Sequence, residues 1–103
     1  MTPEEWLKRA KKIPIPSRYE WAMSVKKHAV GLIFKNRRMP EREWVCYVYL
    51  DDINFSTLIR STYGIGHVNC YLDNGFEEFE FGEDIEAALQ FIAHRALMLG
   101  THV

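Results

Sequence analysis

The chain has 103 residues, 48% of them hydrophobic and 26% charged, and its formal net charge is −1 at pH 7. This composition argues against disorder and fibrous repeats, and the longest apolar stretches, 29–34 and 44–50, are far shorter than the ~20 residues of a membrane-spanning helix. The charged N-terminal segment is unlike a secretory signal, so we expect a single cytoplasmic domain over residues 1–103.

A helix is expected first, close to the N-terminus. Thr2 can act as the N-cap, Pro3 suits the first helical position, and Glu5 completes a capping box. One face of this helix is apolar, and its last turns carry positive charges, which the helix dipole favours there. The apolar residues are Trp6, Leu7 and Ala10, and the charged ones are Lys8, Arg9, Lys11 and Lys12.

Three strands are expected next. Residues 17–27 carry a capping-box pattern, but a strict apolar alternation favours a strand: Tyr19, Trp21, Met23 and Val25. The run 29–35 is expected as a second strand, and the charged segment 35–42 as an exposed loop. The run 43–50 is apolar on both faces, which indicates a central strand with Trp44, Cys46, Val48 and Leu50 on one face and Val45, Tyr47 and Tyr49 on the other.

A short central helix is expected after the third strand. Asp51 and Asp52 break the strand pattern, and Asn54 can cap a helix that ends before Gly64. The apolar side of this helix would be made of Phe55, Leu58 and Ile59.

A β-hairpin follows the central helix. The dipeptide Asn74-Gly75 predicts a two-residue type I′ turn. Counting outward from this turn gives the expected partners, which are Asp73 with Phe76, Cys70 with Phe79, and Val68 with Phe81. The same register predicts a solvent-leaning face made of Asn69, Tyr71, Asp73, Phe76, Glu78 and Glu80.

A long amphipathic helix is expected at the C-terminus. Acidic residues occupy its first turn, and apolar residues follow at helical spacing until Gly100, which is a natural stop. The acidic residues are Glu83, Asp84 and Glu86, and the apolar ones are Ile85, Leu89, Ile92, Ala96 and Leu99. Together these elements predict an α+β domain: an antiparallel sheet of about five strands, meander plus hairpin, with N-terminal, short central and long C-terminal helices packed on it.

No residue pattern specifies a reaction. His67 and Cys70 are spaced like metal ligands, but an offset of three in a strand points their side chains to opposite faces. Cys46 and Cys70 lie in apolar runs and are interpreted as buried thiols. Glu78 and Glu80 point the same way and could in principle act as acid and base, but without a recognisable cleft around them a solvated strand face explains them better. We therefore predict no catalytic residue, no metal ligand, no cofactor and no enzymatic activity.

The charges are distributed unevenly along the chain. Residues 1–45 hold eleven Lys and Arg against five Glu, a net charge of +6, and residues 46–103 hold two Arg against nine Asp and Glu, a net charge of −7. Either the two halves neutralise each other in the folded domain, or the acidic half forms a continuous negative surface. Such asymmetry bears on the binding partners rather than on the fold.

The leading hypothesis is a small protein-interaction module that binds a basic surface of a target, which could itself be a nucleic-acid-binding protein. Exposed aromatic rings beside carboxylates supply contact area and electrostatic steering. The expected binding residues are Tyr71, Asp73, Phe76, Glu78, Glu80, Glu83, Asp84 and Glu86. By size and style the chain suggests an inhibitor or immunity-type factor of a phage or mobile element, acting in host–virus interaction, although no motif ties it to such a family. A homodimer is left open.

The alternative is an accessory protein that binds nucleic acid through its basic half. Phosphate contacts would come from the N-terminal helix and the 35–42 loop. The residues concerned are Lys8, Arg9, Lys11, Lys12, Lys35, Arg37, Arg38 and Arg42. The acidic half would repel phosphate, and the chain carries no recognisable nucleic-acid-binding motif, so this hypothesis ranks second.

Overall fold

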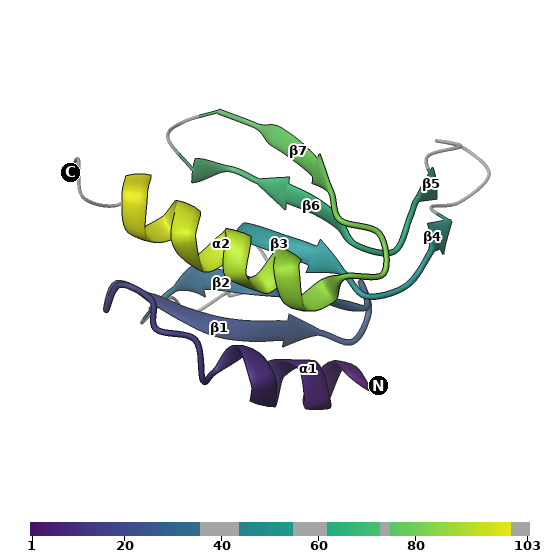
Figure 1. Ribbon diagram of the computed structural model, residues 1–103, viewed down its shortest axis with the longest axis horizontal. Coiled ribbons are helices and arrows are strands. Elements are labelled where there is room, and N and C mark those ends of the chain that lie inside the picture. Colours follow the sequence, from purple (N-terminus) through teal and green to yellow (C-terminus); the bar gives the residue numbers. More distant parts are fainter. Residues whose placement is uncertain (36–43, 55–61, 73–74, 100–103) are drawn as a thin grey trace.

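The sheet is an antiparallel meander (Figure 1). The computed structural model describes residues 1–35, 44–54, 62–72 and 75–99. Five strands pair in the order β1-β2-β3-β6-β7, with bounds Tyr19–Ser24, Ala29–Phe34, Trp44–Tyr49, His67–Cys70 and Glu77–Glu80. A separate two-stranded ribbon, β4 (Ile53–Asn54) with β5 (Thr62–Tyr63), lies in the chain between β3 and β6. The predicted α+β class and the five-stranded antiparallel sheet are confirmed.

Two helices lie within the described residues, whereas three were predicted. α1 (Pro3–Ala10) begins with the predicted capping box between Thr2 and Glu5, and α2 (Ile85–Leu99) follows β7. The predicted central helix falls on 55–61, outside the described residues, and its flanks pair with each other as β4 and β5. Neither described helix is long and apolar enough to cross a membrane.

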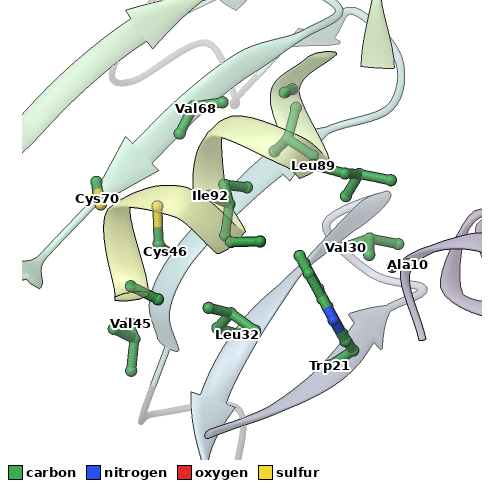
Figure 2. Close-up of a cluster of buried hydrophobic side chains, with 14 of the residues drawn as sticks. Ala10, Trp21, Val30, Leu32, Val45, Cys46, Val68, Cys70, Leu89 and Ile92 are labelled. Carbon is green, nitrogen blue, oxygen red and sulfur yellow. The ribbon is translucent and has the colours of Figure 1, made fainter. Parts of the chain in front are cut away.

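The main core lies between one face of the sheet and the two helices (Figure 2). Val30, Leu32, Cys46 and Val68 point from neighbouring strands toward this side. Val48 belongs to the same cluster, and all five are fully buried. The helices contribute their small and apolar faces to the same cluster, namely Ala10 from α1 and Ile85, Ala88, Leu89, Ile92, Ala93 and Ala96 from α2. The helical spacing predicted for the C-terminal segment is therefore the spacing that fills this core.

Strand β1 confirms that residues 17–27 contain a strand rather than a helix. Tyr19, Trp21 and Met23 face the main core, and the Trp21 indole nitrogen donates a hydrogen bond to the carbonyl of Ile13 at 3.1 Å. The predicted alternation is wrong at Val25, which lies in the turn after β1 and is 61% exposed. The turn reverses the chain before the next core position is reached.

A β-bulge in β3 exchanges the predicted faces of two residues. Leu32 pairs with Cys46, but Ile33 pairs with Trp44, so Val45 is the extra residue of the bulged strand. Val45 consequently joins the main core, and Trp44 packs beside Tyr47 on the other face. The prediction placed Trp44 on the core face and Val45 opposite, because simple alternation carries no signal for a bulge.

The hairpin of β6 and β7 is confirmed, but its register differs from the predicted one by two residues. Val68 pairs with Phe79 rather than Phe81, and Cys70 pairs with Glu77 rather than Phe79. The N–H of Gly75 donates to the carbonyl of Leu72. The predicted turn residue Asn74 and its neighbour Asp73 lie outside the described residues. A shift of two leaves every side chain on its predicted face.

Candidate functional site

The hairpin presents a polar and aromatic face on the side of the sheet opposite α2. We call this surface the hairpin face and define it by His67 and Asn69 of β6, Glu78 and Glu80 of β7, and the flanking Tyr71 and Phe76. These residues share one face because side chains alternate along each strand. Four of the six belong to the predicted binding set, whereas His67 and Asn69 were not assigned a binding role.

The backbone pairing brings the polar side chains of the hairpin face close together. The N–H of Phe81 donates to the carbonyl of Gly66 at 3.0 Å, which makes these two residues a hydrogen-bonded pair. Hydrogen-bonded and non-hydrogen-bonded pairs alternate from there toward the turn. His67–Glu80 and Asn69–Glu78 are therefore non-hydrogen-bonded pairs, and Val68–Phe79 between them is a hydrogen-bonded pair. Such non-hydrogen-bonded pairs have the shortest separation between facing side chains in an antiparallel sheet.

The close approach of Gly66 to the chain after β7 fixes this end of the hairpin. Gly66 has φ +81°, and a Cβ atom at this position would lie 1.9 Å from the carbonyl oxygen of Gly82. Only glycine fits such a contact in the left-handed region. The requirement at Gly66 thus sets where β6 begins opposite the end of β7.

His67 is the centre of a hydrogen-bonded network. Its side chain is 7% exposed, and its Nδ1 contacts Glu80 Oε1 while its Nε2 lies 2.9 Å from Asn69 Oδ1 and 3.1 Å from Glu78 Oε1. Both ring nitrogens of His67 therefore face carboxylate or amide oxygens of the neighbouring side chains.

The network continues into the aromatic side chains of the neighbouring strand. Asn69 Nδ2 donates to the Tyr47 hydroxyl at 3.2 Å, and Asn69 is 3% exposed. The Tyr47 ring stacks with Tyr71 at 6.5 Å between centroids and contacts Tyr49 edge-on at 5.5 Å. Tyr47 and Tyr49 are both buried, although the two described helices pack on the opposite face of the sheet.

Two aromatic rings of the hairpin face remain accessible to solvent. Tyr71 is 47% exposed and Phe76 is 50% exposed, and their ring centroids lie 5.0 Å apart. The carboxylates beside them are also open, since the Glu78 and Glu80 side chains are 46% and 65% exposed. The surface thus offers an aromatic pair and two carboxylates that a buried histidine holds in place.

The remaining acidic residues of the predicted set follow the chain around the β7 edge. Glu83, Asp84 and Glu86 are exposed near the start of α2, where the Asp84 side chain accepts a hydrogen bond from the Ala87 N–H at 3.1 Å. Because α2 packs on the other side of the sheet, these residues do not share a face with Glu78 and Glu80. Asp73 lies outside the described residues.

The described members of the predicted basic set lie toward the opposite edge of the sheet, near β1 and β2. Lys8, Arg9, Lys11 and Lys12 are exposed on α1 and directly after it, and Lys35 is exposed at the end of β2. The Arg9 guanidinium lies over the Trp6 ring, 5.3 Å from its centroid. The other three members, Arg37, Arg38 and Arg42, lie outside the described residues.

The sheet order separates the two charged halves. α1, β1 and β2 come from the basic half, β6 and β7 come from the acidic half, and β3 lies between them. Glu77 pairs with Arg95, and Glu78 and Glu80 pair with His67, so all three find their partners within the acidic half. His28 and Asp51, 3.3 Å apart, join the halves between β2 and β3. The charge asymmetry of the sequence thus becomes an asymmetry between the two edges of the sheet.

Comparison with known proteins found no match to any protein-family model, curated protein or solved structure. Within the described ranges, no group of three or more His, Cys, Asp or Glu side chains is arranged to hold a metal ion. The function is therefore inferred from the residues of the hairpin face and their surroundings.

Proposed function

We propose that this protein is a small interaction module that binds a basic surface of a target protein through the hairpin face, with the partner reaching around the β7 edge to the acidic start of α2. In this proposal it acts in the cytoplasm as an inhibitor or immunity-type factor, as small proteins of phages and mobile elements do. The single observation that carries the proposal is the exposed Tyr71–Phe76 pair beside Glu78 and Glu80.

The chemistry of this surface supports protein binding rather than solvation alone. Aromatic rings supply large contact areas at a low cost in side-chain entropy, and carboxylates steer and orient a basic partner. The His67 network supports the proposal further, because a surface whose side chains are already held loses less conformational freedom on binding. Glutamates that only face solvent would not need a buried histidine between them, as Glu78 and Glu80 have in His67.

The open edge of β7 suggests how a partner could align on this surface. β7 is the last strand of the sheet, and the alternating hydrogen-bond pattern directs the backbone groups of Glu78 and Glu80 away from β6. An extended basic segment could pair with these groups while its Lys or Arg side chains reach the carboxylates. Glutamates on the edge also disfavour pairing of β7 with a second copy of itself.

Affinity capture with matched variants tests this proposal. The double variant Glu78→Gln/Glu80→Gln removes both negative charges but keeps hydrogen-bonding side chains, and Tyr71→Ser removes one ring of the exposed pair. We expect each to lose a protein that nuclease-treated lysate of the native host yields to the wild type. The control Glu4→Gln/Glu20→Gln removes two exposed charges from α1 and β1, and it should retain the same protein. Equal capture by all four proteins would contradict the proposal.

The alternative role, nucleic-acid binding by the basic half, is supported by the exposed lysines of α1 and by Arg9 over Trp6. Replacing Lys8, Lys11 and Lys12 with glutamine should then abolish a gel shift that weakens steeply with salt. Absence of any shift at low salt would rule this role out. A protein captured only without nuclease would favour it over the leading proposal.

A further inference from the structure

Two cysteines that are distant in the sequence face each other across adjacent strands. Cys46 of β3 pairs with Cys70 of β6, and both are free thiols that are buried to 1% exposure or less. Figure 2 shows their sulfur atoms on the core side of the sheet, near α2.

The backbone at this position has the geometry that a disulfide needs. The N–H of Tyr71 donates to the carbonyl of Val45 at 2.7 Å, so these residues form a hydrogen-bonded pair and the adjacent Cys46–Cys70 pair is non-hydrogen-bonded. Cα atoms in such pairs are about 4.5 Å apart, within the range of about 4.4–6.8 Å seen for disulfides. The pairing therefore brings the two backbones as close as a disulfide requires.

The surroundings make Cys70 the more reactive thiol of the two. The hydrogen bond from the Cys46 thiol lowers the pKa of Cys70 to about 7, and the positive charge of Arg95 acts in the same direction. Burial and the neighbouring Cys70 raise the pKa of Cys46 above its ordinary value. Arg95 is held near Cys70 by its ion pair with Glu77, the residue opposite Cys70 in β7.

We propose that Cys46 and Cys70 are a reversible dithiol–disulfide pair that a low-molecular-weight disulfide such as oxidised glutathione converts. The Cys70 thiolate attacks one sulfur of glutathione disulfide and releases a glutathione thiolate, which takes up a proton. Cys46 then loses its proton, and its sulfur attacks Cys70 of the mixed disulfide and releases the second glutathione. Two protein thiols are thereby oxidised to one disulfide, and one glutathione disulfide is reduced to two thiols.

Both sulfur atoms are buried, so a small disulfide reaches them only when the hairpin opens locally from β3. Cys70 is the last residue of β6, and its partner Glu77 is the first residue of β7. The bond would join the hairpin to the central strand β3 and hold the register that places His67 and Asn69. This inference stands on the cysteine geometry and does not depend on the proposed binding function.

The experiment exposes the purified full chain to glutathione redox buffers in two arms, one with folded protein and one during refolding from urea. The thiols are exposed during refolding, so burial does not slow their reaction in the second arm. Alkylation followed by mass spectrometry is expected to show that the oxidised wild type takes up no alkyl group and is two hydrogens lighter than the reduced, unalkylated chain. Peptide mapping should give a single link between Cys46 and Cys70. Its Tm should rise by about 10 °C and return to the starting value with dithiothreitol.

The single variants Cys46→Ser and Cys70→Ser serve as controls. Each should remain unmodified or carry one glutathione, and neither should show the rise in Tm. The proposal would be overturned if the wild type kept two alkylatable thiols in both arms. It would equally be overturned if the wild type carried only glutathione adducts or links between two molecules.

Discussion

Replacing His67 with leucine tests the network that holds the hairpin face in place. The substitution removes three contacts, to Glu78, Glu80 and Asn69, from a side chain that is 7% exposed. Hydrogen bonds to charged groups contribute about 1.5–3 kcal/mol each. Water screens the half-exposed carboxylates, so we take about half that value for each of them. Because leucine restores some apolar burial but leaves Asn69 short of a partner, we expect a loss of about 2–3 kcal/mol.

Urea unfolding followed by circular dichroism measures this loss. The matched control is His94→Leu, since His94 is exposed on α2 and its replacement should change the free energy of unfolding by less than about 0.5 kcal/mol. Combining His67→Leu with Glu78→Gln/Glu80→Gln should cost less than the sum of the separate changes, because the contacts are shared. If His67→Leu were as stable as the control, or if the changes were additive, the network would not position this surface.

Three further predictions concern the framework and the thiols. Gly66→Ala should lower the free energy of unfolding in urea by about 3 kcal/mol or more, because the added Cβ atom would lie 1.9 Å from the Gly82 carbonyl oxygen at a left-handed φ. The control Gly64→Ala should lower it by less than about 1 kcal/mol, because a Cβ atom there would lie 3.7 Å from its nearest neighbour. Leu89→Ala should lower the free energy of unfolding by about 2–5 kcal/mol because Leu89 is fully buried, and Leu97→Ala, 55% exposed, should change it little. The pKa of Cys70 is about 7 in the folded protein, below its ordinary 9.0. The free energy of unfolding of the reduced wild type, relative to that of Cys70→Ser, should therefore rise from pH 7 to 9, and this gain should be lost as the pH falls through 7. Urea titrations of both proteins that show no dependence on pH would refute this.

Much of the fold follows from local signals in the sequence. The Thr2 capping box, the alternation from Tyr19 to Met23 and the apolar spacing of α2 each predicted an element that the structure contains. These signals are strong because each depends on neighbours within a few residues. The bulge at Val45 and the two-residue shift of the hairpin were missed, because they depend on how one strand fits another.

The candidate site was predictable in part for the same reason. The side-chain period of a strand is two, so Tyr71, Phe76, Glu78 and Glu80 kept their shared face despite the shift in register. His67 was missed because its role appears only when the correct register sets it against Glu80. The alternation of His67 and Asn69 with the facing glutamates was the available signal. The Cys46–Cys70 pair could not be found, because local patterns do not reveal that β3 lies beside β6.

Hydrogen exchange of the protein, alone and bound to its captured target, tests the central proposal most directly. We predict that binding slows exchange at residues 67–71 and 76–86, which contain the hairpin face and the acidic start of α2, and leaves α1 and β1 unchanged. Protection confined to α1 and β1, with the hairpin exchanging at its free rate, would contradict the proposed binding surface.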